Sequence, residues 1–413
     1  MMGAMRKAAC KLLGIGCLSV LLSACQDPAD PLVLTVWHSW GGSELEALRK
    51  LEQAFRDREP GIRIQSLQIP HDRLKDKFLR SAAANGGPDV LIGDNDWAAT
   101  FTEADLLLPI AGARDTTALM AEQETTQFPP SVREAVRVGD RMVAWPESVE
   151  AVALYYNRKL ISRPPATTAR MFADAAVIDR DDVRGLVLNT AFYFVSPFYL
   201  GGGAKVLDDR GNPAIDTGTG RRMLGWIRDA ARAPGVLATQ EYGKPDALFK
   251  AGKAAMIVNG PWALADYRSK LGPDLGVAVL PRLGTGKPAA PWVGVKCMMV
   301  NANLPIGRRS TTAKFLRLVA EPAMQRMLAE TAGHVPAVRG VALGSDSPLE
   351  VFQRQITTGT PKRVDPRLGV VWEPMDRAIQ EAVVHGIPAA EALKRAQATI
   401  VARLAAMTAQ EAP

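Results

Sequence analysis

The chain has 413 residues and a formal net charge of +7, and 47% of its residues are hydrophobic. This length exceeds what one hydrophobic core normally supports and indicates two domains. Lysine and arginine are scattered, which excludes the clustered basic pattern of a nucleic-acid-binding protein. No segment after residue 24 is long and apolar enough to span a membrane.

The first 25 residues have the pattern of a bacterial secretory signal. Three basic residues precede a short apolar run over residues 12–22, about half of the roughly 20 residues that a bilayer-spanning helix needs. Leu-Ser-Ala then leads into Cys25, and this resembles the lipobox of bacterial lipoproteins. The resemblance implies removal of residues 1–24, lipidation of Cys25 and a tether over residues 25–30; the alternative is an ordinary signal peptide cut elsewhere. We expect an exported protein at the periplasmic or extracytoplasmic face, held to the membrane through its lipid anchor only.

Strands and helices alternate directly after this tether. Ser43 and Glu46 have the spacing of a capping box, which places a helix start after the first strand. The predicted elements are a strand over 32–37, a helix from 43, a strand over 62–67, a helix through 74–82 and a strand over 89–92. This βαβ order predicts a parallel sheet in an α/β protein.

The strand and helix pattern returns in the second half of the chain. Pro261 is expected to open a helix, because proline is favoured at the first helical position. The other predicted elements are strands over 255–258 and 277–280, a closing helix over 388–404 and a frayed tail over 406–413. Cys297 lies in an apolar run and is expected to be a buried, inert thiol outside any disulfide.

Three loops share one composition and one position relative to the predicted strands. They are HSWGG (38–42), GDNDW (93–97) and NGPW (259–262), and each follows the carboxyl end of a strand, where ligands bind in open α/β sheets. Each combines a tryptophan with hydrogen-bonding groups. A sugar needs this pairing, since its C–H faces stack on flat rings and its hydroxyl groups need fixed polar partners. The alternative is that these tryptophans pack in the core.

Other chemistries find little support in the sequence. The adjacent Tyr155 and Tyr156 could hold ferric iron, but they fall in a predicted strand, where tyrosines usually pack. Residues 284–287 fail the phosphate-loop pattern, and the sequence contains neither a zinc-binding HExxH nor a GxSxG nucleophile motif. We therefore expect no metal, no cofactor and no enzymatic activity. His71 and His334 are interpreted as loop residues.

Five stretches of the chain, in order, resemble the extracellular solute-binding proteins of bacterial ABC importers, in the sugar-binding family typified by maltose-binding protein. They are residues 86–110, 144–161, 248–267, 275–303 and 371–400. The resemblance implies a periplasmic-binding-protein-like α/β fold with two α/β lobes, hinge-crossing segments and a ligand cleft between the lobes. The implied boundaries are 31–148 with 295–345 for the first lobe, and 149–294 with 346–405 for the second.

The resemblance also assigns site residues. Asp96 and Glu150 fall on sugar-binding carboxylates, Trp262 falls on a stacking tryptophan, Trp372 lies within one position of another, and Arg377 falls on a cleft arginine. The remaining candidates come from the loops and their neighbours: His38, Trp40, Gly41, Asp94, Trp97 and Trp292, then Ser39, Tyr193, Tyr199 and Gly294 as weaker ones. Gly93 and Trp97 replace a tryptophan and an arginine of the maltose binder, which makes maltose itself doubtful.

The implied function is capture of an extracytoplasmic carbohydrate by cleft closure and delivery to an ABC permease, by a chain expected to be a monomer. Two alternatives remain open. The same scaffold could bind an anionic ligand such as a glycerophosphodiester or a sugar acid, because helix starts at Ser43 and Pro261 could hold an anion. The chain could also be a carbohydrate-active enzyme, with Asp94 and Asp96 as a carboxylate pair.

Overall fold

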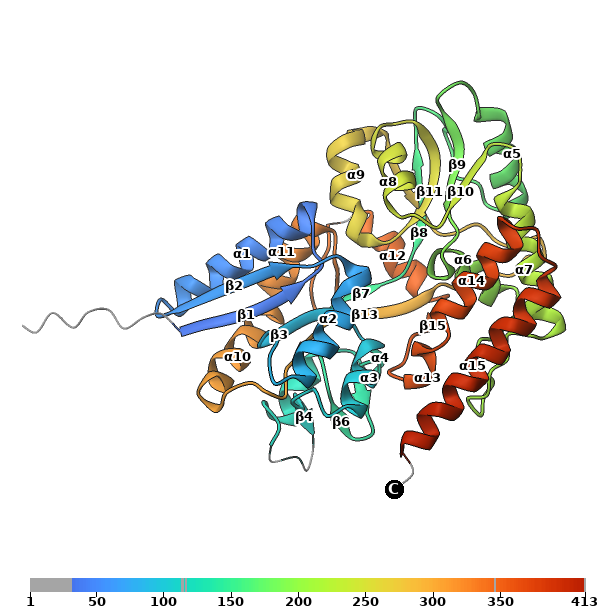
Figure 1. The fold of residues 1–413 in the computed structure, drawn as a ribbon. Helices are drawn as coiled ribbons and strands as arrows, with labels where there is room; N and C mark the ends of the chain where they lie inside the picture. Colours follow the sequence, from blue (N-terminus) through green and yellow to red (C-terminus); the bar gives the residue numbers. More distant parts are fainter. Residues whose placement is uncertain (1–31, 113–114, 116, 345–346, 412–413) are drawn as a thin grey trace, which may run out of the picture.

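The computed structural model describes residues 32–112, 115, 117–344 and 347–411. The predicted signal, Cys25 and the tether lie outside these residues. Two bodies, each a sheet covered by helices, lie side by side and are joined by several chain segments (Figure 1). Within the described ranges, none of the helices has the length and apolar character needed to cross a bilayer.

The first lobe is built on a sheet with strand order β14-β7-β13-β3-β1-β2, and β15 pairs with β13. Its strands are β1 (Leu32–His38), β2 (Ile62–Gln68), β3 (Val90–Asp94), β7 (Trp145–Glu150), β13 (Trp292–Val300), β14 (Val335–Pro336) and β15 (Thr360–Pro361). The strands β1, β2 and β3 are parallel, which confirms the predicted βαβ units. The helices are α1 (Gly42–Arg58), α2 (His71–Ala83), α3 (Trp97–Glu103), α4 (Pro130–Glu134), α10 (Ile306–Val319) and α11 (Pro322–Ala332).

The start of α1 differs from the prediction. The helix begins at Gly42, and its capping residue is Gly41, whose backbone N–H donates to Glu44 Oε2 at 3.4 Å. Glu46 instead pairs with Lys50 one turn along the helix. The predicted capping box of Ser43 and Glu46 is therefore wrong by two residues.

The second lobe contains a sheet with strand order β10-β9-β11-β8-β12. Its strands are β8 (Ala153–Asn157), β9 (Arg184–Asn189), β10 (Val236–Thr239), β11 (Ala254–Asn259) and β12 (Leu275–Ala278), and β8 runs antiparallel to both of its neighbours. The helices in this part of the chain are α5 (Thr168–Ile178), α6 (Phe192–Gly201), α7 (Gly218–Ala231), α8 (Gly243–Lys250) and α9 (Leu264–Leu271), with α12 (Leu349–Ile356), α13 (Pro366–Gly369), α14 (Trp372–Val383) and α15 (Ala389–Glu411) nearer the C terminus.

Short elements complete the fold. They are β4 (Ala111–Gly112), β5 (Arg137–Val138), β6 (Arg141–Met142) and the 3-10 turns η1 (Glu122–Gln127), η2 (Pro261–Ala263) and η3 (Gly272–Asp274). Pro261 thus opens a 3-10 turn that leads into α9. The strand expected over 277–280 begins earlier, at Leu275, and ends at Ala278. The closing helix α15 extends to Glu411, past residue 406 where the frayed tail was expected to begin.

Each lobe has its own hydrophobic core, and the chain leaves one core and enters the other where it crosses between the lobes. Val149 belongs to the core of the first lobe and Val152 to that of the second; Trp292 and Val295 mark a second change. The strands β7 and β13 thus connect the two bodies (Figure 1). Cys297, on β13, is fully buried as expected, and burial raises the pKa of its thiol.

Candidate functional site

Buried charges gather where β3 and β7 end, beside the first half of the antiparallel strand β13. Lys296 Nζ lies 2.5 Å from Asp94 Oδ1 and 3.9 Å from Glu150 Oε2. Lys362 Nζ lies 3.0 Å from Asp96 Oδ1. Four of these five residues are less than a tenth exposed, and Asp94 is partly buried. The cluster therefore contains three carboxylates and two ammonium groups held in ion pairs.

Strand register explains why these groups meet. Lys296 on β13 is paired with Asp94 at the end of β3, and Gly294 is paired with Glu150 at the end of β7. A side chain added at Gly294 would crowd Lys362, since a Cβ there would lie 3.1 Å from its Cε. Glycine at this position therefore leaves room for Lys362 to reach Asp96.

Asn95 fixes the loop that carries the two aspartates. Its side chain is fully buried; Nδ2 donates to the carbonyls of Ala135 and Lys362, at 2.6 and 2.7 Å, and Oδ1 accepts from Val295 N–H at 3.1 Å. Every hydrogen-bonding group of the amide is used, so the loop has little freedom. Asn95 thus holds three separate chain segments at the cluster.

The charge states follow from burial and pairing. Burial acts to raise the pKa of Asp94, but Lys296, Lys362 and His71 outweigh it and hold that pKa well below its ordinary value. Burial raises the pKa of Glu150, and neighbouring Asp94 adds to the shift. Burial acts to lower the pKa of Lys296, yet Asp94 and Glu150 outweigh it and raise that pKa well above the ordinary value. The cluster therefore holds fixed positive and negative charges that largely cancel.

Aromatic rings from the second lobe lie beside this cluster. The ring centroid of Tyr193 is 6.2 Å from that of Trp262 and 6.4 Å from that of Trp372. All three rings are partly exposed, so they offer faces to a bound molecule. Tyr242 Oη accepts from Trp262 Nε1 at 3.0 Å and fixes the orientation of that indole.

One tryptophan joins the aromatic group to the charged cluster. Trp372 Nε1, at the first residue of α14, donates to Asp96 Oδ2 at 3.1 Å. Lys362 Nζ lies 5.9 Å from the ring centroid of Tyr193 and 6.0 Å from that of Trp372. Ionised oxygens and flat aromatic faces therefore lie within one region between the lobes.

The end of β1 and the loop after it contribute polar groups and a buried tryptophan. His38 Nδ1 accepts from Trp40 N–H at 3.1 Å, and burial lowers the pKa of His38 to about 4. His38 is thus neutral near pH 7, with its proton on Nε2. Trp40 is 1% exposed and packs edge-on against His334, so it offers no ring face to a ligand in this conformation. Ser39 is partly buried beside it.

Several other predicted site residues lie apart from the cluster or inside the core. Tyr199 is fully buried, and its hydroxyl donates to Ile215 O at 3.3 Å. Trp97 and Trp292 are 6% and 5% exposed and pack in the cores of the first and second lobe. The side chain of Arg377 is 69% exposed and pairs with Glu373 on the same helix. The structure does not bring Trp40, Tyr199 or Arg377 to the charged cluster.

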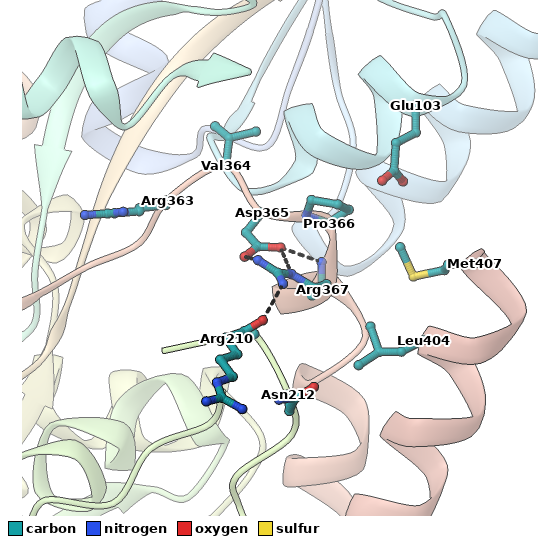
Figure 2. Close-up of a pocket in the computed structure, with 11 residues that line it drawn as sticks. Glu103, Arg210, Asn212, Arg363, Val364, Asp365, Pro366, Arg367, Leu404 and Met407 are labelled. Carbon is teal, nitrogen blue, oxygen red and sulfur yellow. Dashed lines mark hydrogen bonds and ion pairs between the residues drawn. The ribbon is translucent and has the colours of Figure 1, made fainter. Parts of the chain in front are cut away.

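A separate cavity of about 590 Å³ opens near the outer end of α3 (Figure 2). It lies between Glu103, the 210–212 turn, the 363–367 segment and α15. Arg367 spans its wall, because it pairs with Asp365 and also donates to Arg210 O at 3.4 Å. The predicted ligand residues are absent from the lining of this cavity.

Sequence reasoning missed several members of the cluster. Lys296 had a visible signal, because it is the one charged residue in an apolar strand and a buried charge needs a partner. Lys362 and Asn95 had no such signal. His71 is the first residue of α2 rather than a loop residue, and its Nε2 lies 3.0 Å from Asp94 Oδ2. Across the described ranges, no three His, Cys, Asp or Glu side chains are grouped to hold a metal ion.

Comparison with known proteins agrees with this fold. The family profile of bacterial extracellular solute-binding proteins matches residues 50–353. The chain is 25% identical over 359 residues to a maltotriose-binding protein of Pyrococcus abyssi (strain GE5 / Orsay), covering 84% of this chain and 77% of that protein. The chain belongs to the family of bacterial extracellular solute-binding proteins.

Solved structures with the same fold include two maltotriose complexes. The maltose/maltodextrin-binding domain MalE from Bdellovibrio bacteriovorus superposes with a TM-score of 0.83 at 24% identity, over 90% of this chain and 100% of that one. The Thermus thermophilus maltotriose-binding protein superposes with a TM-score of 0.81 at 27% identity, over the same shares of the two chains. These likenesses confirm the expected two-lobed binding-protein fold.

Proposed function

We propose that this protein captures a neutral oligosaccharide between its lobes and delivers it to the permease of an ABC importer. The contact between Trp372 and Asp96 is the main support for this proposal, because it brings an aromatic ring and an ionised oxygen from different lobes to one place. Sugars use both kinds of group. A ligand that touches both lobes would favour the closed form, whereas a ligand with equal affinity for both forms would shift nothing.

The charge balance of the site favours a neutral ligand over an anionic one. Lys296 and Lys362 are already paired with carboxylates, at 2.5 and 3.0 Å. The start of α1 is also occupied, since Ser43 N–H donates to Asp266 Oδ1 at 3.2 Å. An anion would therefore have to displace a carboxylate to gain a cationic partner. The proposed ligand is an uncharged carbohydrate, bound through hydroxyl groups and ring stacking.

Malto-oligosaccharides are the first probes to use, because the relatives and structures named above bind maltotriose. The proposed site residues are Asp94, Asp96, Glu150, Tyr193, Trp262 and Trp372, with Lys296 and Lys362 as their charged partners and His38, Ser39, Gly41 and Gly294 at the edge. A dissociation constant in the micromolar range, which corresponds to a binding free energy of about −8 kcal/mol, would allow both capture and release. We also propose that Cys25 carries the lipid anchor and that the protein acts as a monomer.

A thermal-shift panel tests the ligand class. Ligands that bind only the folded state raise the melting temperature. Maltotriose and other neutral oligosaccharides are compared with sugar acids and glycerophosphodiesters at equal concentration. The proposal expects a shift with at least one neutral oligosaccharide that is absent in Trp262→Ala. A shift restricted to the anionic compounds would overturn it and favour the anionic alternative.

An incubation experiment separates binding from catalysis. The protein is mixed with maltoheptaose, and the products are followed by chromatography over a day. The proposal expects intact oligosaccharide. Hydrolysis that disappears in Asp96→Ala would show a carbohydrate-active enzyme and contradict the binding-protein function.

A further inference from the structure

A second group of buried charged residues lies behind the ligand site. His334 follows α11, is 3% exposed and has a carboxylate at each ring nitrogen. Nδ1 lies 2.7 Å from Glu147 Oε1, and Nε2 lies 3.2 Å from Glu44 Oε1. Two ionised carboxylates offer only acceptors, so this arrangement favours the doubly protonated imidazolium, which donates from both nitrogens.

The two carboxylates belong to different segments of the site. Glu147 is fully buried on β7, three positions before the site residue Glu150. Glu44 lies in the first turn of α1, and its second oxygen accepts from the N–H of Gly41 in the loop after β1. His334 therefore connects β7, the hinge strand that leads toward the second lobe, to the loop after β1 that carries Trp40 and Gly41.

Ring packing and hydrogen bonds hold the residues around His334 in place. The Trp40 ring lies 5.2 Å from the imidazole in an edge-on arrangement. Gln325 Nε2 donates to Glu147 O at 2.9 Å and holds the backbone of the hinge strand. Val335, the next residue, pairs with Val149 of β7. The imidazole thus has one position, set by packing on one side and by strand pairing on the other.

Burial explains why this ion pair matters. Among the described residues Glu147 Oε2 is buried and accepts no hydrogen bond, so His334 is the charge partner on which this carboxylate depends. A buried carboxylate without a partner is strongly unfavourable. Loss of His334 would leave Glu147 without this charge partner. Either β7 or α11 would then shift so that water reached the carboxylate, or the carboxylate would take up a proton.

We infer that His334 is a positioning residue of the ligand site, which joins the hinge strand β7 through Glu147 to the loop after β1 through Glu44. This inference rests on the proposed function for its effect on affinity. If the cleft binds a sugar, the two ion pairs of His334 keep Glu150 and the loop after β1 at a fixed separation. The lobes can then close on the ligand without a rearrangement of these two segments. His334 does not itself touch the ligand.

Hydrogen–deuterium exchange tests the link without any ligand. Glu44→Gln removes the ion pair between His334 and the loop side and leaves the pair between His334 and Glu147. His334→Gln removes both ion pairs. We expect faster exchange over residues 38–45 in both variants, and over residues 145–150 in His334→Gln only. Ile227→Ala, a core substitution in α7 of the second lobe, is the matched control for a general loss of stability. Unchanged exchange over residues 38–45 in both variants, or equal acceleration in Ile227→Ala, would overturn the inference.

Affinity for maltotriose provides the functional readout. We expect Glu44→Gln to weaken binding about tenfold, the size expected for one hydrogen bond to a charged group, with a small change in melting temperature. Ile227→Ala should lower the melting temperature and leave affinity unchanged. Equal affinity in Glu44→Gln and wild type would overturn the positioning role. Failure of the wild-type protein to bind any neutral sugar would instead overturn the proposed function, and the exchange experiment would still decide the link.

Discussion

Trp372 Nε1 donates a hydrogen bond to Asp96 Oδ2 at 3.1 Å, and the two residues come from different lobes. Asp96 directly precedes α3 in the first lobe, while Trp372 begins α14, which packs on the core of the second. The same carboxylate pairs with Lys362. One side chain thus links a stacking surface, a buried cation and the region between the lobes.

Asp96→Asn should weaken oligosaccharide binding and destabilise the fold. The substitution removes the charge that pairs with Lys362, which is 5% exposed, and breaking a buried ion pair in this way costs about 3 kcal/mol. Calorimetry and chemical denaturation measure the two effects. Asp209→Asn is the control, since that side chain is 91% exposed and should change neither quantity. Wild-type affinity in Asp96→Asn would remove this residue from the site.

Trp262→Ala should lower affinity roughly ten- to hundredfold through the loss of a stacking face. Trp262 is partly exposed and is oriented by Tyr242, so its removal should disturb the core little. Trp226→Ala on α7 is the control, because that ring packs with Phe172 and Phe198 away from the charged cluster. An equal loss of affinity in both variants would mean that the effect is general destabilisation rather than stacking.

The free energy of unfolding should fall as the pH rises from about 7 to about 10. Burial acts to lower the pKa of His334, but Glu147 and Glu44 outweigh it and raise that pKa from 6.5 to about 10. A group whose folded pKa is raised adds stability that is complete below its unfolded pKa and is lost as the pH passes through its folded pKa. Urea denaturation at pH 7 and pH 10 measures the change.

The comparison with His334→Gln isolates this contribution. The variant should be less stable than wild type at pH 7 and should lose less stability between pH 7 and pH 10. Parallel curves for the two proteins over this pH range would mean that His334 is neutral in the folded protein. Such a result would also contradict the two charged hydrogen bonds of the imidazolium.

Cys297 should resist thiol reagents in the folded protein. The side chain is fully buried on β13 and burial raises its pKa, so very little reactive thiolate is present at neutral pH. Labelling with a maleimide, followed by mass spectrometry of the peptide that contains Cys297, should show modification only on addition of denaturant. Rapid labelling of the native protein would mean that β13 opens locally.

Much of the fold could be predicted because local signals were strong. The apolar strands before HSWGG and GDNDW, and the glycine and proline residues that end the helices, correctly indicated βαβ units. The start of α1 was harder to predict from the sequence. Ser43 has the composition of a capping residue, yet its N–H is satisfied by Asp266 from the other lobe, and a contact this distant in sequence leaves no local pattern.

The site could be predicted only in part, for a related reason. Position at the end of a strand drew attention to Asp94 and Asp96, which the structure places in the charged cluster, but it does not tell whether a neighbouring tryptophan points outward or inward. Trp40 turns toward His334 and is buried for that reason. Lys362 enters the site through an ion pair with Asp96 and a hydrogen bond from Asn95, and both partners are far away in the chain.

Calorimetric titration of the wild-type protein with maltotriose is the most direct test of a cleft built for neutral sugars. We predict saturable heat with one ligand per chain, a dissociation constant in the micromolar range, which corresponds to a binding free energy of about −8 kcal/mol, and loss of that heat in Trp262→Ala. Absence of saturable heat with maltotriose and every other neutral oligosaccharide tried, together with tight binding of a glycerophosphodiester, would contradict it.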